Sequence, residues 1–336
     1  MKVITGIDIG KSAVKVVTKD LSFLIPSVVS YGSVSSAFDF LVTSNNDFVV
    51  SINDLKEHYM AGSIATTGHV NLIAMDENKV GLPYAVLTCA ALSKILTPNG
   101  HSEVVLATAL PYTVYERDKQ ILKKTLTDIK RFTVNKNHFS VSIHPVVVHE
   151  PGAVFMSLVL DSSGTLKNKE LLKQKVAVVD VGHRTVNLLL LFQGKELPSS
   201  HSTLTGAYSF LQKSLSELAK KVGILSLDDQ QLVVEKISKN ENFVVNGNFV
   251  PIDYFEPVKY EFLKAIEVAV SSVIRDFRCD RLIFAGGGSE WLKSLISSCF
   301  PNATVVDNPR FAVANGLFKY AVFVNNRTET RFTKQV

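Results

Sequence analysis

The sequence has few cysteines and no paired ones. Only Cys89, Cys279 and Cys299 occur in 336 residues, and none belongs to a C-x-x-C pair. Disulfide scaffolds and cysteine-rich metal sites depend on paired cysteines, so the composition argues against both classes. We therefore expect three buried free thiols in a protein of a reducing compartment.

Long hydrophobic runs are also missing. No segment holds about 18 consecutive apolar residues, the length that a membrane-spanning helix needs. At the N-terminus Asp8 interrupts the apolar segment before the core of a secretion signal could form. These absences predict a soluble cytoplasmic protein with no membrane partner.

Charge of one sign is not concentrated in a long block. Thirty-six basic and 31 acidic side chains give a formal net charge of +5. Lys167, Lys169, Lys173 and Lys175 form a basic stretch of the kind typical of a solvated loop. Because DNA binding through phosphate contacts needs clustered Lys and Arg, we expect no strong direct binding to DNA.

What the chain does contain is enough apolar sequence for about two globular domains. Hydrophobic residues make up 46% of the chain, which excludes a disordered protein, and 336 residues exceed the usual size of a single core. The patterns predict strands at 3–7, 14–17, 104–109, 139–148, 175–180, 188–192, 281–285 and 303–306, and helices at 83–96, 116–127, 150–160, 210–222, 262–277, 289–299 and 309–323. Such alternation predicts an α/β architecture.

Each half of the chain opens in the same way. Asp8-Ile-Gly10 follows an apolar strand and precedes a second strand, and Asp180-Val-Gly182 repeats this order about half the chain later. The spacing predicts an internal duplication, with each half beginning as a hairpin around a D-x-G turn. Asn246-Gly247 predicts one further hairpin, between residues 243 and 253.

A D-x-G turn brings backbone N–H groups and a carboxylate together. The N–H groups can surround phosphate oxygens, the glycine lets the backbone approach them, and the aspartate can hold the water shell of Mg²⁺. A third glycine loop, Gly286-Gly287-Gly288, lies between a predicted strand and a predicted helix and suits an anion in the same way. One such turn is common in proteins, but three in register with a duplication favour a nucleotide site.

This constellation resembles the superfamily of actin, the sugar kinases and the heat-shock chaperone ATPases. Asp8 to Lys15 is similar to its first phosphate motif, and Asp180 to Thr185 to its second. His149-Glu150-Pro151-Gly152-Ala153 and the segment 309–316 resemble its two connecting helices. The resemblance covers nearly the whole chain and implies a duplicated actin-like, ribonuclease H-like α/β fold with a nucleotide cleft between the halves.

The resemblance also implies a role for each matching residue. Asp8 and Asp180 are expected to hold Mg²⁺ through water, and Glu150 to orient the attacking water. The residues expected around the phosphates are Gly10, Lys11, Ser12, Lys15, Gly182 and Thr185. Those expected around the nucleoside are Glu235, Lys236, Gly286, Gly287 and Gly288. The expected cofactors are ATP, with GTP as an alternative, and Mg²⁺.

Two short segments are similar to the plasmid-segregation proteins of the ParM/StbA type: residues 107–111, which end in Leu110-Pro111, and Leu24-Ile-Pro-Ser27. The implied function is a filament-forming ATPase that segregates plasmid DNA, with itself and a DNA-binding adaptor as partners. The expected domains are residues 1–160, with a C-terminal helix at about 309–330 packing back on them, and residues 175–308.

Two points stay open at the level of the sequence. His183, Arg184 and Asn187 depart from the residues that the superfamily often has in its second phosphate loop. Exposure of Arg184, or a filament contact, is favoured over a phosphate contact. The alternative function is a superfamily member that does not polymerise, either a small-molecule kinase or an ATP-binding adaptor of the cell-division or pilus type.

Overall fold

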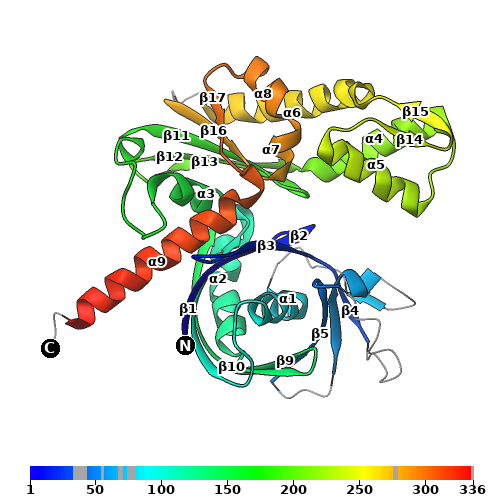
Figure 1. The fold of residues 1–336 in the computed structure, drawn as a ribbon. Helices are drawn as coiled ribbons and strands as arrows, with labels where there is room; N and C mark the ends of the chain where they lie inside the picture. The colour runs from blue at the N-terminus through cyan, green and yellow to red at the C-terminus, as the bar shows by residue number, and fades with distance from the viewer. Residues whose placement is uncertain (33–43, 54–56, 67–70, 74–79, 275–278, 334–336) are drawn as a thin grey trace. The chain divides into compact units, whose positions relative to one another are not determined.

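The computed structural model describes residues 1–32, 44–53, 57–66, 71–73, 80–274 and 279–333. These residues form two compact units. Unit 1 comprises residues 1–169 and 313–336, and unit 2 comprises residues 170–312. Figure 1 shows that each unit is built around a β-sheet of its own.

The sheet of unit 1 has ten strands in the order β3-β2-β1-β8-β10-β9-β5-β6-β4-β7. Their bounds are β1 Lys2–Ile9, β2 Ala13–Val17, β3 Ser22–Pro26, β4 Val29–Tyr31, β5 Asp47–Ile52, β6 Tyr59–Gly62, β7 Asn71–Ile73, β8 His101–Leu110, β9 Arg131–Val134 and β10 Asn137–His149, with a 3-10 turn at Ser63–Thr66. β1, β8 and β10 run parallel to one another, and the other pairs are antiparallel.

Helix α1 (Leu82–Ser93) forms the centre of the unit 1 core. All ten residues from Pro83 to Leu92 are buried. A helix that is apolar on every face is stable only when it is enclosed on every side, and here the curved sheet surrounds it (Figure 1). The packing therefore explains a helix whose sequence lacks a polar face.

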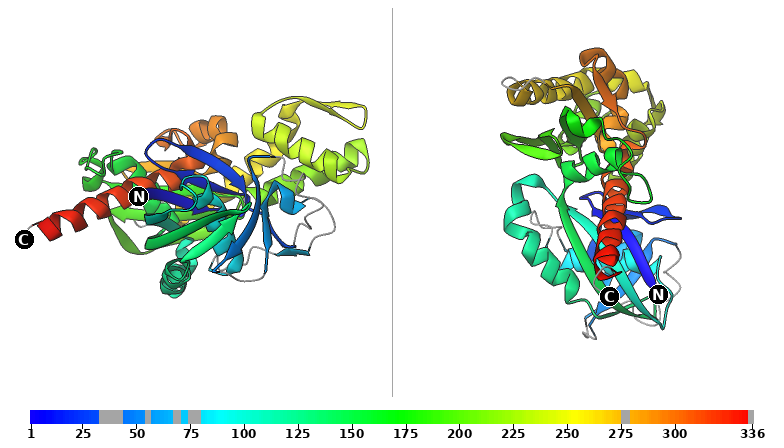
Figure 2. Two further views of the ribbon diagram at one scale, coloured as in Figure 1. Left: turned by 60° about the horizontal axis from the view of Figure 1, so that its bottom comes forward. Right: turned by 90° about the vertical axis from the view of Figure 1, so that its left-hand side faces the viewer.

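The other helices of unit 1 are α2 (Tyr112–Thr127), α3 (Glu150–Val159) and α9 (Ala312–Thr333). α9 runs beside β1 in both views of Figure 2, and Lys2 forms an ion pair with Glu329 at 2.7 Å. Lys319 on α9 donates a hydrogen bond to the carbonyl of Ser157 on α3. Burial lowers the pKa of this lysine.

The sheet of unit 2 has five strands in the order β13-β12-β11-β16-β17. They are β11 Lys175–Val181, β12 Thr185–Phe192, β13 Lys195–Thr205, β16 Arg281–Ala285 and β17 Ala303–Val305. An antiparallel meander of three strands is followed by two parallel ones, as in β3-β2-β1-β8-β10 of unit 1. The shared order confirms the duplication that the two D-x-G turns predict.

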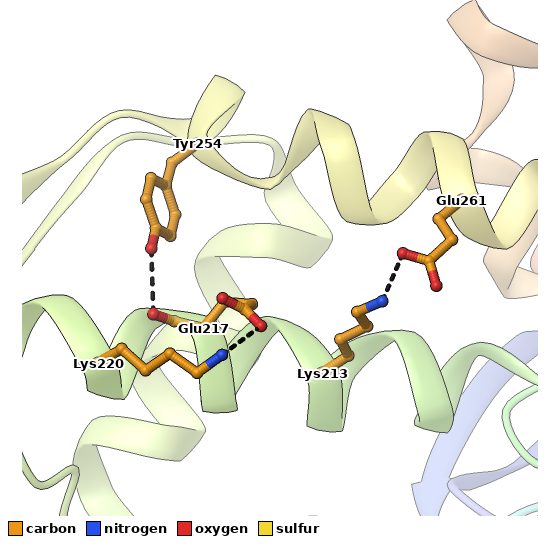
Figure 3. Close-up of polar contacts among 5 residues, drawn as sticks. All are labelled: Lys213, Glu217, Lys220, Tyr254 and Glu261. Atoms are coloured by element: carbon orange, nitrogen blue, oxygen red, sulfur yellow. Dashed lines mark hydrogen bonds and ion pairs between the residues drawn. The ribbon is translucent and has the colours of Figure 1, made fainter.

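Helices α4 (Ala207–Val222), α5 (Leu227–Lys239) and α6 (Glu256–Ile274) and the hairpin β14 (Phe243–Val245) with β15 (Asn248–Val250) complete most of unit 2, together with 3-10 turns at Leu171–Lys173, Ile252–Phe255 and Pro309–Phe311. Tyr254 donates a hydrogen bond to the carbonyl of Glu217 at 3.1 Å, and Lys213 pairs with Glu261 (Figure 3). These contacts tie α4 to the segment that leads into α6.

The predicted elements are found with shifted ends, and three differences are informative. The helix expected at 289–299 is two short helices, α7 (Gly287–Trp291) and α8 (Lys293–Cys299), which are separated at Leu292. Phe277, expected in the helix at 262–277, lies outside the described residues. β3, β9, β13, α5 and the strands of residues 29–73 were not predicted.

The three cysteines are free thiols, but only one of them is buried. Cys89 lies inside α1, where burial raises its pKa and keeps the thiol protonated. Cys279 and Cys299 are partly exposed, because Cys279 lies before β16 and Cys299 is the last residue of α8. The expectation of three buried thiols was therefore wrong for these two. None of the helices in the described part of the chain combines the length and apolar character of a membrane span.

Candidate functional site

The predicted phosphate residues of unit 1 lie on one hairpin. Asp8 on β1 is paired across the ladder with Lys15 on β2, and the lysine Nζ lies 2.9 Å from the aspartate Oδ2. Both side chains are largely shielded from solvent, and Asp8 is only 5% exposed. Because both members of the pair are buried together, their attraction is screened less than that of a surface pair.

Gly10 closes the turn of this hairpin. Its N–H donates to the carbonyl of Ala13 at 3.1 Å, and a Cβ at Gly10 would lie 2.7 Å from Lys15 Nζ. The ammonium therefore occupies the space that a side chain at residue 10 would take. Ser27, at the end of the Leu24 to Ser27 segment, donates its N–H to the carbonyl of Ser12 and supports the loop from behind.

Glu150 lies at the same edge of the sheet as Asp8. Register pairs join Ile7 of β1 to Thr108 of β8, and Thr108 to Val147 of β10, so the carboxyl ends of these three parallel strands meet at one edge. Open α/β sheets bind their ligands at this edge. Glu150 begins α3 directly after β10 and is 6% exposed. Unit 1 thus brings together Asp8, the loop 10–12, Lys15 and Glu150 at one edge of its sheet.

One residue of this site was missed by the sequence analysis. His149 is the N-cap of α3, and its Nδ1 accepts a hydrogen bond from the N–H of Gly152 at 2.9 Å. Pro151 has no N–H, and the N–H of Gly152 is used by the cap, so neither residue offers a free donor at the start of α3. The signal was the spacing of His149 and Gly152, which equals that of a capping side chain and the third helical residue.

Unit 2 repeats the hairpin in the same register. Asp180 of β11 is paired with Asn187 of β12, seven residues apart as Asp8 and Lys15 are, and the N–H of Gly182 donates to the carbonyl of Thr185 at 2.9 Å. Asn187 takes the place of the lysine, and its amide donates to Thr185 Oγ1 at 3.3 Å. The cross-strand neighbour of Asp180 therefore contributes no charge.

The turn of unit 2 is held by the first residues of α4. The carbonyls of Gly182, His183 and Arg184 accept the N–H groups of Ala207, Tyr208 and Gly206, at 3.0, 2.7 and 2.8 Å. In a trans peptide the C=O and the following N–H point in opposite directions. The N–H groups of residues 183 and 184 consequently point away from α4, as a turn that surrounds an anion requires.

The side chain of Arg184 lies outside this turn. It is exposed, and its Cζ lies 4.4 Å from the centre of the Tyr208 ring. An arginine stacked on an aromatic ring gains a cation–π contact and loses little hydration. This position agrees with the exposure expected for Arg184.

The glycine loop 286–288 packs on the end of β11. A Cβ at Gly286 would lie 2.5 Å from Asp180 Oδ1, and one at Gly288 would lie 2.4 Å from a methyl group of Val181. Gly286 also has a φ of +84°, which favours glycine. Its N–H donates to the carbonyl of Pro309 and is therefore not the free N–H for an anion that the sequence suggested in this loop. The loop thus packs against Asp180 and Val181, just before the turn that carries Gly182 and Thr185.

Glu235 and Lys236 lie on α5 and are each ion-paired. Glu235 contacts Lys239 at 2.6 Å, and this hydrogen bond lowers the pKa of the carboxyl group. Lys236 contacts Glu241 at 2.7 Å. Their contact with a nucleoside remains a prediction.

The carboxylates of both hairpins fit a hydrated Mg²⁺. Asp180 is 5% exposed, and the missing side chain of Gly286 leaves room for its carboxylate. Asp8 is already paired with Lys15, so it suits contact with metal-bound water better than direct ligation.

Comparison with known proteins identifies the fold. Residues 6–152 match the family described as "Actin like proteins N terminal domain". Over nearly the whole chain, the fold agrees with that of solved actin homologues. The chain has the actin-like fold. No curated protein sequence matches it.

Three solved structures illustrate the agreement. The archaeal actin homolog Ta0583, in its complex with ADP, is 16% identical with a TM-score of 0.75, over 95% of this chain and 99% of its own. The psk41 ParM protein without ligand is 17% identical with a TM-score of 0.76, over 98% and 99%. ParM of a 15-stranded filament from Clostridium botulinum is 19% identical with a TM-score of 0.73, over 95% and 99%. At these identities the likeness establishes the actin-like fold alone.

Proposed function

We propose that this actin-like protein is an ATPase that binds Mg-ATP, assembles into filaments and thereby segregates plasmid DNA. The observation that carries the proposal is the pair of matching hairpins, each with a buried aspartate, a glycine-closed turn and a fixed cross-strand partner at the seventh following residue. A hairpin with only a structural role does not require these three features, so their presence in both halves of the chain favours a shared functional role.

The similar structures support the nucleotide and the filament separately. Ta0583 was solved with ADP, and the Clostridium botulinum protein was solved as a filament. In this chain, Lys15 and the N–H groups of both turns are suited to the phosphates. GTP is the alternative nucleotide.

The chemistry assigned to the residues is positioning and charge neutralisation, which is most of what phosphoryl transfer asks of a protein. Mg²⁺, when bound, neutralises phosphate charge. Lys15 places a largely shielded ammonium beside the first turn, and Asp8 fixes it there. Glu150 orients water by accepting a hydrogen bond from it, as a buried carboxylate at the sheet edge can do.

The proposal is tested by light scattering and phosphate release on the purified full chain. Adding Mg-ATP should raise scattering, electron micrographs should show filaments, and phosphate should appear without any added acceptor. GTP in place of ATP tests the nucleotide preference. No nucleotide binding by calorimetry would contradict the proposal at its base.

The alternative classes give different results in the same experiment. A small-molecule kinase would release ADP only when its acceptor is present and would form no filaments. A non-polymerising adaptor would bind ATP and stay monomeric or dimeric. Either result would replace the filament proposal while leaving the nucleotide site in place.

A further inference from the structure

We propose that His149 is a positioning residue for hydrolysis, because its imidazole fixes the first turn of α3 and with it the carboxylate of Glu150. This inference rests on the proposed role of Glu150. His149 acts through the helix and needs no contact with the nucleotide.

The cap joins His149 to the residue that it positions. Glu150 is the first residue of α3, and the hydrogen bond from the Gly152 N–H to His149 Nδ1 spans it at 2.9 Å. A helix end without a cap frays within its first turn, and an N-cap contributes about 1 kcal/mol to holding it. Without the cap, the backbone that carries the Glu150 side chain is free to change its direction.

The ring itself is held from a second element. Tyr112 and Tyr115 of α2 both pack edge-on against the imidazole, each with a centroid distance of 5.6 Å. Tyr115 in turn donates a hydrogen bond to the carbonyl of Val147 on β10 at 3.2 Å. Asn and Asp, the usual capping residues, have no ring against which two tyrosines could pack. His149 therefore couples the start of α3 to α2 as well as capping it.

Gly152 is shaped to receive this ring. A Cβ at residue 152 would lie 2.4 Å from Cε1 of His149 and 2.9 Å from its Nδ1. The φ of Gly152 is ordinary for a helix, so the glycine is required by the close approach of the ring and not by backbone strain. Glycine also costs about 1 kcal/mol in a helix relative to alanine. Glycine at residue 152 is therefore unfavourable for the helix itself, but it leaves the room that the His149 ring needs.

The capping bond requires an imidazole that is unprotonated at Nδ1 and carries its proton on Nε2. Ionisable and charged groups around the ring include Glu150 in the same turn, Tyr112 and Tyr115 of α2, and Lys119, whose Nζ lies 5.0 Å from the Tyr115 ring centre. Protonation of Nδ1 removes the acceptor, so acidification should release the cap.

The experiment compares variants of the full chain that separate the acceptor from the ring. His149→Asn keeps an acceptor and loses the ring, and His149→Phe keeps the ring and loses the acceptor. We expect His149→Phe to lower kcat for ATP hydrolysis at least about tenfold, since small displacements of a catalytic group have effects of this size. Its Kd for ATP should stay within about twofold. His149→Asn should keep kcat within about threefold, because Asn is a good N-cap.

Two further readouts exclude a merely structural role. The wild-type rate should fall on acidification through protonation of Nδ1, and His149→Asn should lack that part of the pH profile. Gly152→Ala should slow hydrolysis in the wild-type chain and have little effect in the His149→Asn background, where no ring meets the new methyl group.

Equal loss of kcat in His149→Phe and His149→Asn, or an unchanged kcat in His149→Phe, would overturn the positioning role. Glu150→Ala is measured alongside. If Glu150→Ala hydrolyses ATP slowly and His149→Phe does so normally, only the positioning proposal fails. If Glu150→Ala is itself unimpaired, the proposed function of Glu150 fails first.

Discussion

Asp8 and Asp180 hold equivalent places in two hairpins and face different neighbours. Lys15 neutralises the first aspartate at 2.9 Å, whereas the amide of Asn187 stands opposite the second. The duplication thus keeps the backbone geometry and changes the charge. We infer that the two aspartates have different roles: Asp8 holds an ammonium, and Asp180 is better suited to the water shell of a cation.

Glu150 gives the prediction that belongs to the residue scale. Glu150→Ala should slow phosphate release by about 100-fold, the size of effect that proton-transfer groups commonly have. Its Kd for ATP should not change, because the carboxylate acts on water and not on the phosphates. Asp161→Ala, at the exposed loop after α3, is the matched control and should release phosphate at the wild-type rate. Phosphate release from Glu150→Ala at the wild-type rate would show that the assignment is wrong.

At the scale of elements, α9 packs on α3 and β1 through glycines that have no room for a side chain. A Cβ at Gly316 of α9 would lie 1.7 Å from the carbonyl oxygen of Ala153 on α3, and a Cβ at Gly6 of β1 would lie 2.4 Å from that of Ala314. These close contacts all lie within unit 1.

Gly316→Ala should therefore destabilise unit 1, because two backbones must move apart. We expect a loss of about 2 to 3 kcal/mol in the free energy of unfolding, as for other overpacked cores, measured by urea denaturation. Gly100→Ala is the control, since its nearest neighbour would lie 3.9 Å from the new Cβ. Equal stability of the two variants would contradict the close packing of α9 on α3.

The elements also show what the sequence could and could not predict. The hairpins, the parallel strands and α3 were predictable because each has a clear apolar pattern. The D-x-G turns mark the ends of β1 and β11, and the Glu-Pro pair marks the start of α3. Helix α5 was missed although Ser226 and Asp229 form a reciprocal capping box, a pattern that is visible in the sequence. The strands between residues 29 and 73 are three to six residues long. β4 pairs with β6 and β7, and β5 with β9, across long stretches of sequence, so no local pattern marks these pairings.

The site was predictable to the extent that it is local. The turns 8–15 and 180–187 each carry their residues within one hairpin, so sequence spacing was enough to find them. The spacing of His149 and Gly152 is a local signal for the cap, but the tyrosines that hold the ring, Tyr112 and Tyr115, lie more than thirty residues earlier in the chain. The packing of Gly286 on Asp180 likewise follows from the pairing of β11 with β16, which sequence spacing does not show.

At the scale of the whole molecule, the net charge and its distribution predict whether the protein binds DNA directly. The net charge is +5, and within the basic stretch Lys173 is paired with Glu170 at 2.7 Å. We therefore expect plasmid attachment to run through a separate DNA-binding adaptor. In a gel shift near physiological salt, the protein alone should not move its plasmid's centromere-like DNA, and the adaptor should restore recruitment. A shift by this protein alone at submicromolar concentration, resistant to competitor DNA, would contradict the adaptor.

Sedimentation with Mg-ATP is the measurement that tests the central claim most directly, since it shows whether nucleotide binding drives assembly. The wild-type chain should pellet with Mg-ATP and return to the supernatant as the nucleotide is hydrolysed, and chelation of Mg²⁺ should prevent pelleting. Asp180→Ala should stay in the supernatant, because the carboxylate proposed for the water shell of Mg²⁺ is lost. Glu150→Ala should pellet and persist. Normal pelleting of Asp180→Ala, or of the wild-type chain without nucleotide, would contradict nucleotide-driven assembly.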